Sequence, residues 1–384
     1  MKICLVSSSF YPATSYGGPI YATWDLSRNI IQKDVKVYVS TTNANGGGRL
    51  HVNTNRFIEK EKNLFIKYYH EQLINRFSFQ FVLGVFSDIK QSDVVYIQYL
   101  FHYTVLISLF FSFLQNKKVM LCPRGSLSLY GLNYKRKWVK RLWLSLLIKP
   151  FLRNVIWHAS SFLEENDIKR TFPHAKILII PDGVDFKSFQ RFKLYDKRGL
   201  LKRYTNIDFQ DVSNIFFSMG RLHVIKGFDV LIDAFSMFLK DDKNAKLIIA
   251  GGDDGVEKKL RQQILDLELQ SSVFLIGAVD FEDKNILLNN CDYFTLASEF
   301  ESFGIVVAEA LSCGKPIILS NKTSWENLEK NKCGILVDNN KISLYNAFLK
   351  IVQIKYDGKE IKNYVKSHFD WSLISEIFLN NIKK

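Results

Sequence analysis

The sequence predicts an α/β protein with two domains, each built on a parallel sheet. A chain of 384 residues is longer than one hydrophobic core usually grows, so two domains are expected. Short apolar runs recur along both halves, and helix-length segments separate them, as is typical of repeated βαβ units. The hydrophobic fraction of 47% and the charged fraction of 23% are those of a globular protein.

Apolar runs mark the expected strands of both domains. In the first half they cover residues 3–7, 35–41, 94–98, 119–122, 155–159 and 177–180. In the second half they cover residues 215–219, 247–250, 273–276, 293–296, 317–320 and 334–337. Residues 51–76 are irregular and predict an elaborated loop or an extra hairpin. The stretch 94–116 carries no formal charge, but polar residues interrupt it, which favours a buried strand–helix unit over a membrane span.

The domain boundary is expected where the pattern is weakest. Residues 186–207 are polar and charged, so the first domain is predicted over 1–190 and the second over 191–366. The last segment, 367–384, has the apolar periodicity of an amphipathic helix, which could pack back on the first domain.

The net charge of +14 is unevenly distributed. Between Asp93 and Glu164 there is no acidic residue, whereas ten are Lys or Arg. Some of these cations alternate with Trp and Leu, as in helices that dock on anionic membranes. A plain solvated face is the alternative, and no nucleic-acid motif accompanies the charge. The predicted membrane-facing residues are Lys135, Arg136, Lys137, Trp138, Lys140, Arg141 and Trp143.

The cysteines and the N-terminus both favour a cytoplasmic location. The five cysteines are scattered and have neither metal-ligand nor redox spacing, so we expect reduced core residues. The chain begins directly with a strand-like run and shows no signal-peptide pattern. With the basic segment, this predicts a protein peripheral to the inner face of the cytoplasmic membrane.

The loop after the run 215–219 carries two cations beside glycines. Arg221 follows Gly220, and Lys226 precedes Gly227. The Arg fork and the Lys point charge together can neutralise a diphosphate. The spacing is not that of a Walker loop. The alternative is that both are ordinary surface cations.

Two carboxylates, Glu301 and Glu309, flank a segment that reads as a loop entering a buried helix. Gly304 lies where that helix would begin, and the first N–H groups of a helix have no partner within it, so they can bind an anion. The two carboxylates could grip the two ends of a phosphate-bearing ligand. The alternative is one surface Glu and one ordinary helical Glu.

A glycine pair, Gly17 and Gly18, follows the first predicted strand. It could let the backbone approach a phosphate or a sugar, or it could be a plain strand–helix turn. No G-x-G-x-x-G fingerprint occurs at any predicted strand end, which argues against a nicotinamide or flavin enzyme.

Taken in order, these motifs resemble the retaining nucleotide-sugar glycosyltransferases of family four, which have the GT-B fold of two Rossmann-like domains facing across a cleft. The resemblance covers nearly the whole chain. It rests on residues 220–227, 247–252 and 298–311, and on 181–185 before the predicted boundary, where Asp182 stands in place of the commoner Asn.

The resemblance implies roles for the candidate residues. Arg221 and Lys226 would hold the donor diphosphate and, with Glu301 beside the donor sugar, form the catalytic set. Glu309 would bind the ribose. The remaining implied donor contacts are Gly17, Gly18, Phe303, Gly304 and Ile305. Such enzymes retain anomeric configuration and need neither a metal nor a cofactor beyond the nucleotide sugar, because the cations stabilise the departing diphosphate.

One departure from the family pattern concerns residues 122–126. Many members carry a His there, whereas this chain has Arg124 in a Pro-Arg-Gly sequence, a variant that recurs in bacterial members building lipopolysaccharide or capsule. Arg124 could contact phosphate or acceptor. Glu164 resembles a cleft residue of relatives and could likewise contact phosphate or acceptor, although an acid at a helix N-terminus is an adequate alternative.

The sequence therefore predicts a bacterial glycosyltransferase of surface-polysaccharide biosynthesis. Its donor would be a nucleotide-diphosphate sugar and its acceptor a lipid-linked glycan. Two alternatives remain open at this stage: a nucleotide-sugar hydrolase or epimerase of the same fold, and a non-catalytic membrane-associated scaffold.

Overall fold

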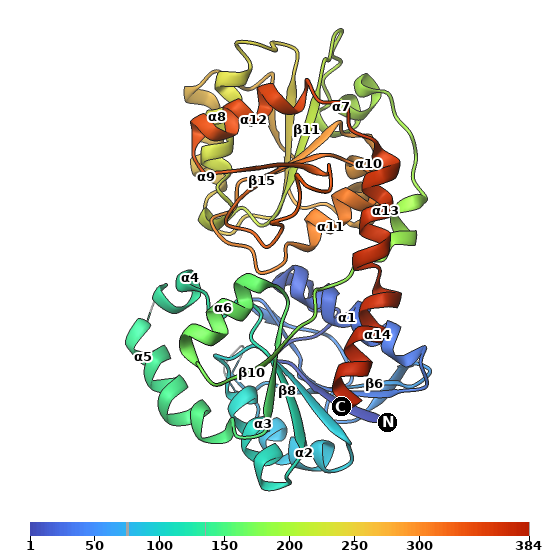
Figure 1. Cartoon of the computed structure of the whole chain (residues 1–384), viewed down its shortest axis with the longest axis vertical. Coiled ribbons are helices and arrows are strands. Elements are labelled where there is room, and N and C mark those ends of the chain that lie inside the picture. Colours follow the sequence, from blue (N-terminus) through green and yellow to red (C-terminus); the bar gives the residue numbers. More distant parts are fainter. Residues whose placement is uncertain (74–76, 135, 384) are drawn as a thin grey trace. The chain divides into compact units, whose positions relative to one another are not determined.

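The computed structural model describes residues 1–73, 77–134 and 136–383, which form two compact units (Figure 1). The first unit comprises Met1–Gly183 together with Trp371–Lys384, and the second comprises Val184–Asp370. The boundaries expected at residues 190 and 366 differ from these by a few residues. Each unit contains a mainly parallel sheet with helices packed against it, which confirms the predicted α/β class.

The first unit has an eight-stranded sheet in the order β10-β9-β8-β7-β1-β2-β6-β5. All neighbours are parallel except β5 and β6. The strands are β1 (Lys2–Val6), β2 (Lys36–Thr42), β5 (Ile58–Glu61), β6 (Leu64–Tyr69), β7 (Val94–Gln98), β8 (Lys118–Cys122), β9 (Val155–Ala159) and β10 (Lys176–Ile179). The irregular segment is thus an added hairpin, β5–β6, whose second strand extends the parallel sheet beside β2. A further short hairpin joins β3 (Ala44–Asn45) and β4 (Gly48–Arg49).

Helices connect these strands, and the chain returns to this unit at its end. The helices are α1 (Gly18–Ile31), α2 (Phe79–Lys90), α3 (Tyr103–Leu114), α4 (Leu129–Asn133), α5 (Lys137–Leu142), α6 (Phe162–Thr171) and α14 (Trp371–Lys383). Helix α5 continues as a π-helical segment, η2 (Trp143–Ile148), and a 3-10 turn, η3 (Lys149–Phe151). Helix α14 packs against α1. Gly183 permits this return, because a Cβ there would lie 2.4 Å from the ring of Trp371.

The second unit has a six-stranded parallel sheet in the order β13-β12-β11-β14-β15-β16. The strands are β11 (Ile215–Met219), β12 (Lys246–Ala250), β13 (Val273–Leu275), β14 (Tyr293–Leu296), β15 (Ile317–Ser320) and β16 (Gly334–Val337), and each overlaps a predicted run. This is the doubly wound order 3-2-1-4-5-6, whose direction reverses between β11 and β14. Ligands of such sheets bind beyond the carboxyl ends of the strands at that switch point.

Helices cover both faces of this second sheet. They are η4 (Phe186–Gln190), α7 (Lys197–Thr205), η5 (Val224–Lys226), α8 (Phe228–Phe238), α9 (Glu257–Asp266), α10 (Phe281–Asn290), α11 (Ile305–Ser312), α12 (Lys341–Ile351) and α13 (Gly358–Phe369). Successive strand residues point to opposite faces. Accordingly, Ile215 and Phe217 pack in the core beneath α10, α11 and α13, and Phe216 packs in the core beneath α8, α9 and α12.

The five cysteines are all buried and unpaired, as the sequence predicted. Burial raises the pKa of the Cys122 and Cys291 thiols to about 12, so they stay protonated and unreactive near neutral pH. Among the described residues, no helix combines the length and the apolar character that crossing a bilayer requires.

Phe216 is the residue whose truncation should damage the second unit most clearly. Its ring contacts those of Phe235, Phe238, Tyr293 and Phe348 at centroid distances of 4.9 to 5.8 Å. We expect Phe216→Ala to lower the free energy of unfolding by about 3–5 kcal/mol, because it leaves a cavity among these rings. Urea unfolding measures this loss.

The control for Phe216→Ala is Leu265→Ala in α9, whose side chain is exposed, and its effect should stay within about 0.5 kcal/mol. Equal losses in the two variants would contradict this account of the core.

Candidate functional site

Two glycines allow the loops at the switch point of the second unit to approach one another. Gly227 has a φ of 63°, and a Cβ there would lie 2.1 Å from the carbonyl oxygen of Ala297, which follows β14. A Cβ on Gly251 would lie 1.8 Å from the carbonyl oxygen of Gly220. Because backbone atoms cannot yield as a flexible side chain can, both positions require glycine, and the loops after β11, β12 and β14 meet at one point.

Lys226 and Glu301, two of the predicted residues, meet at this point. The Nζ of Lys226 forms an ion pair with Oε1 of Glu301. The hydroxyl of Ser298 donates to the same oxygen at 3.2 Å. Both charged side chains are mostly buried, so the low local dielectric strengthens the pair. The structure thus places a fixed cation beside a fixed carboxylate at the edge where ligands of this fold bind.

Glu309 lies on α11 and has a partner that sequence reasoning missed. The Nζ of Lys284, on α10, donates to Oε1 of Glu309 at 2.5 Å. The same ammonium lies over the rings of Phe189 and Phe281. Lys284 belongs to no recognisable motif, and only the packing of α10 against α11 brings it to Glu309.

Arg221 does not join the Lys226–Glu301 pair. Its guanidinium forms an ion pair with Asp254, on the loop after β12, and the side chain is 55% exposed. An exposed pair of this kind contributes little to stability. Arg221 is therefore able to change partners at low cost.

The N-terminus of α11 has the geometry predicted for it. Gly304 is its N-cap residue with a φ of 77°. The Phe303 side chain is buried against Trp325 and Phe369, and its carbonyl accepts a 2.7 Å hydrogen bond from Nε1 of Trp325. The helix start is thereby anchored, and the unpaired N–H groups of its first turn, beginning at Ile305, have a fixed direction.

In the first unit, Gly17 and Gly18 stand at the carboxyl end of β1, next to β7. Gly17 is the N-cap of α1 with a φ of 78°, and Gly18 begins that helix. The sheet order reverses between β1 and β7, so this loop occupies the switch point of the first sheet. Beside it, Oγ1 of Thr23 lies 2.7 Å from the carbonyl of Pro19 and 2.8 Å from Oε1 of Gln98.

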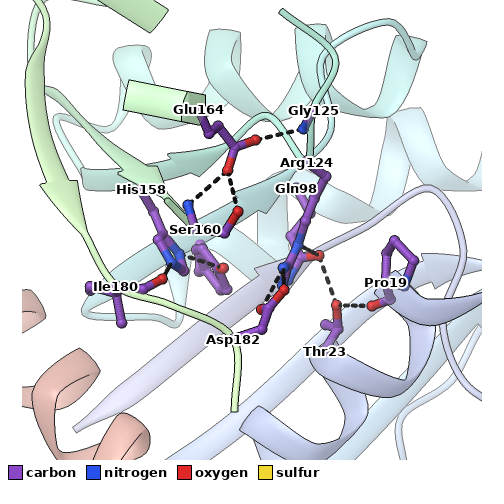
Figure 2. A network of polar contacts seen from close by, with 11 residues as sticks. Pro19, Thr23, Gln98, Arg124, Gly125, His158, Ser160, Glu164, Ile180 and Asp182 are labelled. Carbon is purple, nitrogen blue, oxygen red and sulfur yellow. Dashed lines mark hydrogen bonds and ion pairs between the residues drawn. The ribbon is translucent and has the colours of Figure 1, made fainter. Parts of the chain in front are cut away.

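Arg124 is buried in an ion pair, as Figure 2 shows. Its Nη1 donates to both carboxylate oxygens of Asp182, at 2.6 and 2.8 Å, and its Nε lies 3.3 Å from Oε1 of Gln98. The side chain is only 3% exposed. This guanidinium holds the loop after β8 to the segment that closes the unit, and its contact with phosphate or acceptor stays a prediction. The two departures from the family pattern, at positions 124 and 182, are the two halves of one ion pair.

Glu164 likewise binds backbone within the unit (Figure 2). Its Oε1 accepts from the N–H of Gly125 at 2.5 Å, and its Oε2 accepts from the N–H and the hydroxyl of Ser160 at 2.7 and 2.8 Å. Burial raises the pKa of this carboxyl. The side chain connects the loops after β8 and β9, and its contact with phosphate or acceptor stays a prediction.

His158 is a further buried polar residue of this network, and the sequence did not single out its role. Its Nε2 lies 2.7 Å from the carbonyl oxygen of Ile180 and therefore carries the proton. Its Nδ1 then accepts from the hydroxyl of Tyr96 at 2.8 Å. Desolvation, together with the charge of Arg124, lowers the pKa of His158 to about 4, so the ring is neutral at physiological pH.

The predicted membrane-facing residues divide into two groups. Arg136, Lys137, Trp138 and Arg141 are exposed, Trp138 by 74%. Two others, Lys140 and Trp143, are only partly exposed and bind backbone carbonyls of the same unit. The Nζ of Lys140 donates to the carbonyls of Gly131 and Tyr134, and Nε1 of Trp143 donates to the carbonyl of Leu100. Lys135 lies outside the described residues.

Two units that each contain a doubly wound, mainly parallel sheet are the features of the GT-B fold. Superposition on solved structures leads to the same fold. Anabaena Alr3699/HepE in complex with UDP-glucose superposes with a TM-score of 0.77 at 18% identity, over 100% of this chain and 99% of the other. Sucrose-phosphate synthase from Thermosynechococcus elongatus superposes with a TM-score of 0.75 at 17% identity, over 100% and 98%. The predicted fold class is confirmed.

Residues 205–368, which lie within the second unit, match the family model described as Glycosyl transferases group 1. The alpha-monoglucosyldiacylglycerol synthase of Streptococcus pneumoniae is 27% identical over 154 residues, which are 40% of this chain and 34% of that protein. The mannosylfructose-phosphate synthase of Agrobacterium fabrum is 28% identical over 166 residues, 41% of this chain and 34% of that protein. The chain thus spans about a third of the length of these relatives.

The Arg124–Asp182 pair can be tested by unfolding measurements. Asp182→Asn should cost about 3–5 kcal/mol, because it leaves a buried guanidinium without its counter-charge. The double variant Arg124→His with Asp182→Asn, the combination typical of the resembling family, should recover at least half of that loss. If the loss of unfolding free energy in the double variant equals the sum of the losses in the two single variants, the two residues do not act as a pair.

His158 should make stability depend on pH. Its pKa is lower in the folded state, about 4, than the ordinary 6.5, so the unfolded chain binds more protons between these values. The contribution of neutral His158 to the free energy of unfolding should therefore be fully present above pH 6.5. It should fall by about 3 kcal/mol as the pH drops to 4.

His102, whose pKa burial also lowers to about 4, adds a similar loss. Urea unfolding at several pH values gives the slope of the free energy of unfolding against pH. Between pH 4 and 6.5, His158→Gln should remove about half of that slope. Replacing the exposed His174 with Gln is the control and should leave the slope unchanged. An unaltered slope in His158→Gln would refute the assignment.

Proposed function

We propose that this chain is a glycosyltransferase that moves a sugar from a nucleotide-diphosphate sugar to an acceptor. The observation that carries the proposal is the Lys226–Glu301 pair. It stands at the switch point of the second sheet, beside the N-terminus of α11, within the segment that matches the group 1 family model.

The geometry supports this chemistry on physical grounds. Departure of a nucleoside diphosphate develops negative charge on its phosphate oxygens, and groups fixed in advance stabilise that charge without reorganising. Lys226 is such a group, since Glu301 and the glycine contacts around Gly227 hold it in place. The first-turn N–H groups of α11 would add the partial positive charge of a helix N-terminus beside the diphosphate.

Arg221 would reach the diphosphate by exchanging its exposed partner Asp254 for it. Such an exchange sacrifices only a weak surface interaction, whereas a bidentate guanidinium–phosphate contact is strong. Glu309 would accept hydrogen bonds from the ribose hydroxyls, with Lys284 fixing the direction of its carboxylate.

Retention of anomeric configuration and metal independence are proposed from the family resemblance. Glu301 would position the donor sugar, and the leaving phosphate oxygen would take the acceptor proton on the same face. In this arrangement Arg221 and Lys226 supply the positive charge at the diphosphate.

We further propose a lipid-linked glycan as acceptor, in bacterial surface-polysaccharide synthesis, at the inner face of the cytoplasmic membrane. Two relatives carry names that include a lipid, the alpha-monoglucosyldiacylglycerol synthase above and the yeast phosphatidylinositol N-acetylglucosaminyltransferase GPI3 subunit. The exposed Trp138 with its neighbours Arg136, Lys137 and Arg141 suits an anionic membrane surface.

A thermal-shift screen of UDP-, GDP-, ADP- and CMP-sugars identifies the donor. At a hundred times its dissociation constant, the true donor should stabilise the protein by about 2.7 kcal/mol. With that donor, Lys226→Ala should lower kcat/KM by about 10²–10³, the loss typical of removing one charge-stabilising group.

Lys259→Ala is the matched control for Lys226→Ala. Lys259 is an exposed lysine of the same unit that pairs with Asp229, and its loss should leave the rate unchanged. Equal rates in both variants would show that Lys226 does not act on the donor. Release of nucleotide at the same rate with and without glycan would indicate a hydrolase instead.

A further inference from the structure

The first unit contains a cavity at the edge of its sheet where β8 and β9 begin, opposite to the carboxyl edge where Gly17 and Gly18 lie. Its volume is about 410 Å³, and it is lined by the end of α3, the turn η3 and the first residues of β8 and β9. The amino ends of these strands surround it, whereas ligands of α/β sheets bind at the carboxyl ends. The proposed transfer chemistry leaves this cavity without a role.

The cavity is positively charged. Lys117 and Arg153 both line it. The Nζ of Lys117 donates to the carbonyls of Lys90 and Ser92, at 3.0 and 2.5 Å, which fixes the ammonium without neutralising it. Within the described part of the chain, neither Lys117 nor Arg153 forms an ion pair with a carboxylate. An anion entering the cavity would therefore meet uncompensated positive charge.

The wall of the cavity contains a buried polar residue, Ser112. Ser112 is fully buried and lines the cavity. Across residues 1–73, 77–134 and 136–383, its Oγ has no hydrogen-bond partner. This hydroxyl is enclosed in the wall of the cavity, so the cations rather than Ser112 would contact an anion there.

An apolar surface adjoins the cavity. Phe151 lines it, and its ring packs against Phe110 and Phe113 of α3, at centroid distances of 5.6 and 5.8 Å. Phe110, Phe113 and the neighbouring Leu114 are exposed. Exposed apolar residues continue on α2, which packs against α3 (Figure 1), and these are Phe79, Leu83 and Phe86.

We propose that this cavity binds the phosphate of an anionic glycerophospholipid, while the apolar α2–α3 surface lies in the bilayer interface. The proposal rests on the membrane association in the proposed function and gives it a specific binding site. A phospholipid carries its phosphate and its acyl chains side by side, as the cavity and the apolar surface lie side by side here. A free phosphate or a nucleotide would leave that surface exposed to water, which soluble monomers rarely tolerate over large patches.

Vesicle co-sedimentation tests the proposal with two variants that remove one exposed cation each. On phosphatidylglycerol–phosphatidylcholine vesicles, Lys137→Gln, outside the cavity, should weaken binding about fivefold, as expected for one cation near an anionic surface. Arg153→Gln should weaken it more than tenfold, because it removes a direct phosphate contact. Equal losses of vesicle affinity in the two variants would indicate general electrostatic attraction and would refute a phosphate-binding site in the cavity.

A soluble lipid provides the second measurement. Dihexanoyl phosphatidylglycerol below its micelle concentration should raise the melting temperature of the unmodified protein and leave that of Arg153→Gln unchanged. An equal rise with inorganic phosphate would show a phosphate site rather than a lipid site. Displacement of the vesicles by an equal charge of single-stranded RNA would likewise overturn the lipid assignment.

A failure of the lipid-site proposal can be distinguished from a failure of the glycosyltransferase proposal. Stabilisation by the nucleotide-sugar donor is measured in the same preparations and should be the same in Arg153→Gln as in the unmodified protein. If donor binding is intact while Arg153→Gln and Lys137→Gln behave alike on vesicles, the lipid site is refuted and the glycosyltransferase proposal stands.

Discussion

The candidate donor site depends on the contact between Gly227 and the carbonyl of Ala297. In a doubly wound sheet, the loops after the two strands at the switch point approach each other closely. Here the approach is so close that a single Cβ would prevent it. Because Gly227 follows Lys226 directly, the same contact sets where the ammonium lies, and Glu301 then fixes its direction. The backbone geometry of the turn at Gly227 thus determines where the charge of Lys226 lies.

The first unit uses buried charge differently. Arg124, Asp182 and Glu164 are almost completely enclosed, and each charge is matched by an opposite charge or by N–H donors. Burying such groups is costly unless they are paired. Their arrangement therefore specifies one position for the loops after β8 and β9 at the carboxyl edge of the sheet, where Gly17 and Gly18 also stand. Loops held in this way keep their geometry without a ligand, which is what a preorganised binding site requires.

The basic segment shows how one helical stretch can serve two purposes. Lys140 and Trp143 have the composition of a membrane anchor, yet their polar atoms bind backbone carbonyls of the same unit. The residues between them, Arg141 and Leu142, remain exposed. Helical periodicity separates the two sets, since residues three or four apart share a face. Exposed apolar residues also lie on α2 and α3, among them Phe79, Leu83 and Phe113, and the charge pattern did not indicate them.

The sequence by itself determined the fold class, the strands of the second sheet, those of the first sheet except β5 and β6, and the segments that carry the candidate donor site. It could do so because strand burial, helix periodicity and glycine-dependent turns are local properties of the chain. It did not reveal that Lys226 pairs with Glu301, that Lys284 orients Glu309, or that Arg124 and Asp182 neutralise each other. Those pairs join residues 75, 25 and 58 positions apart, and only the tertiary structure decides them, because side-chain partners across a fold depend on how whole elements pack.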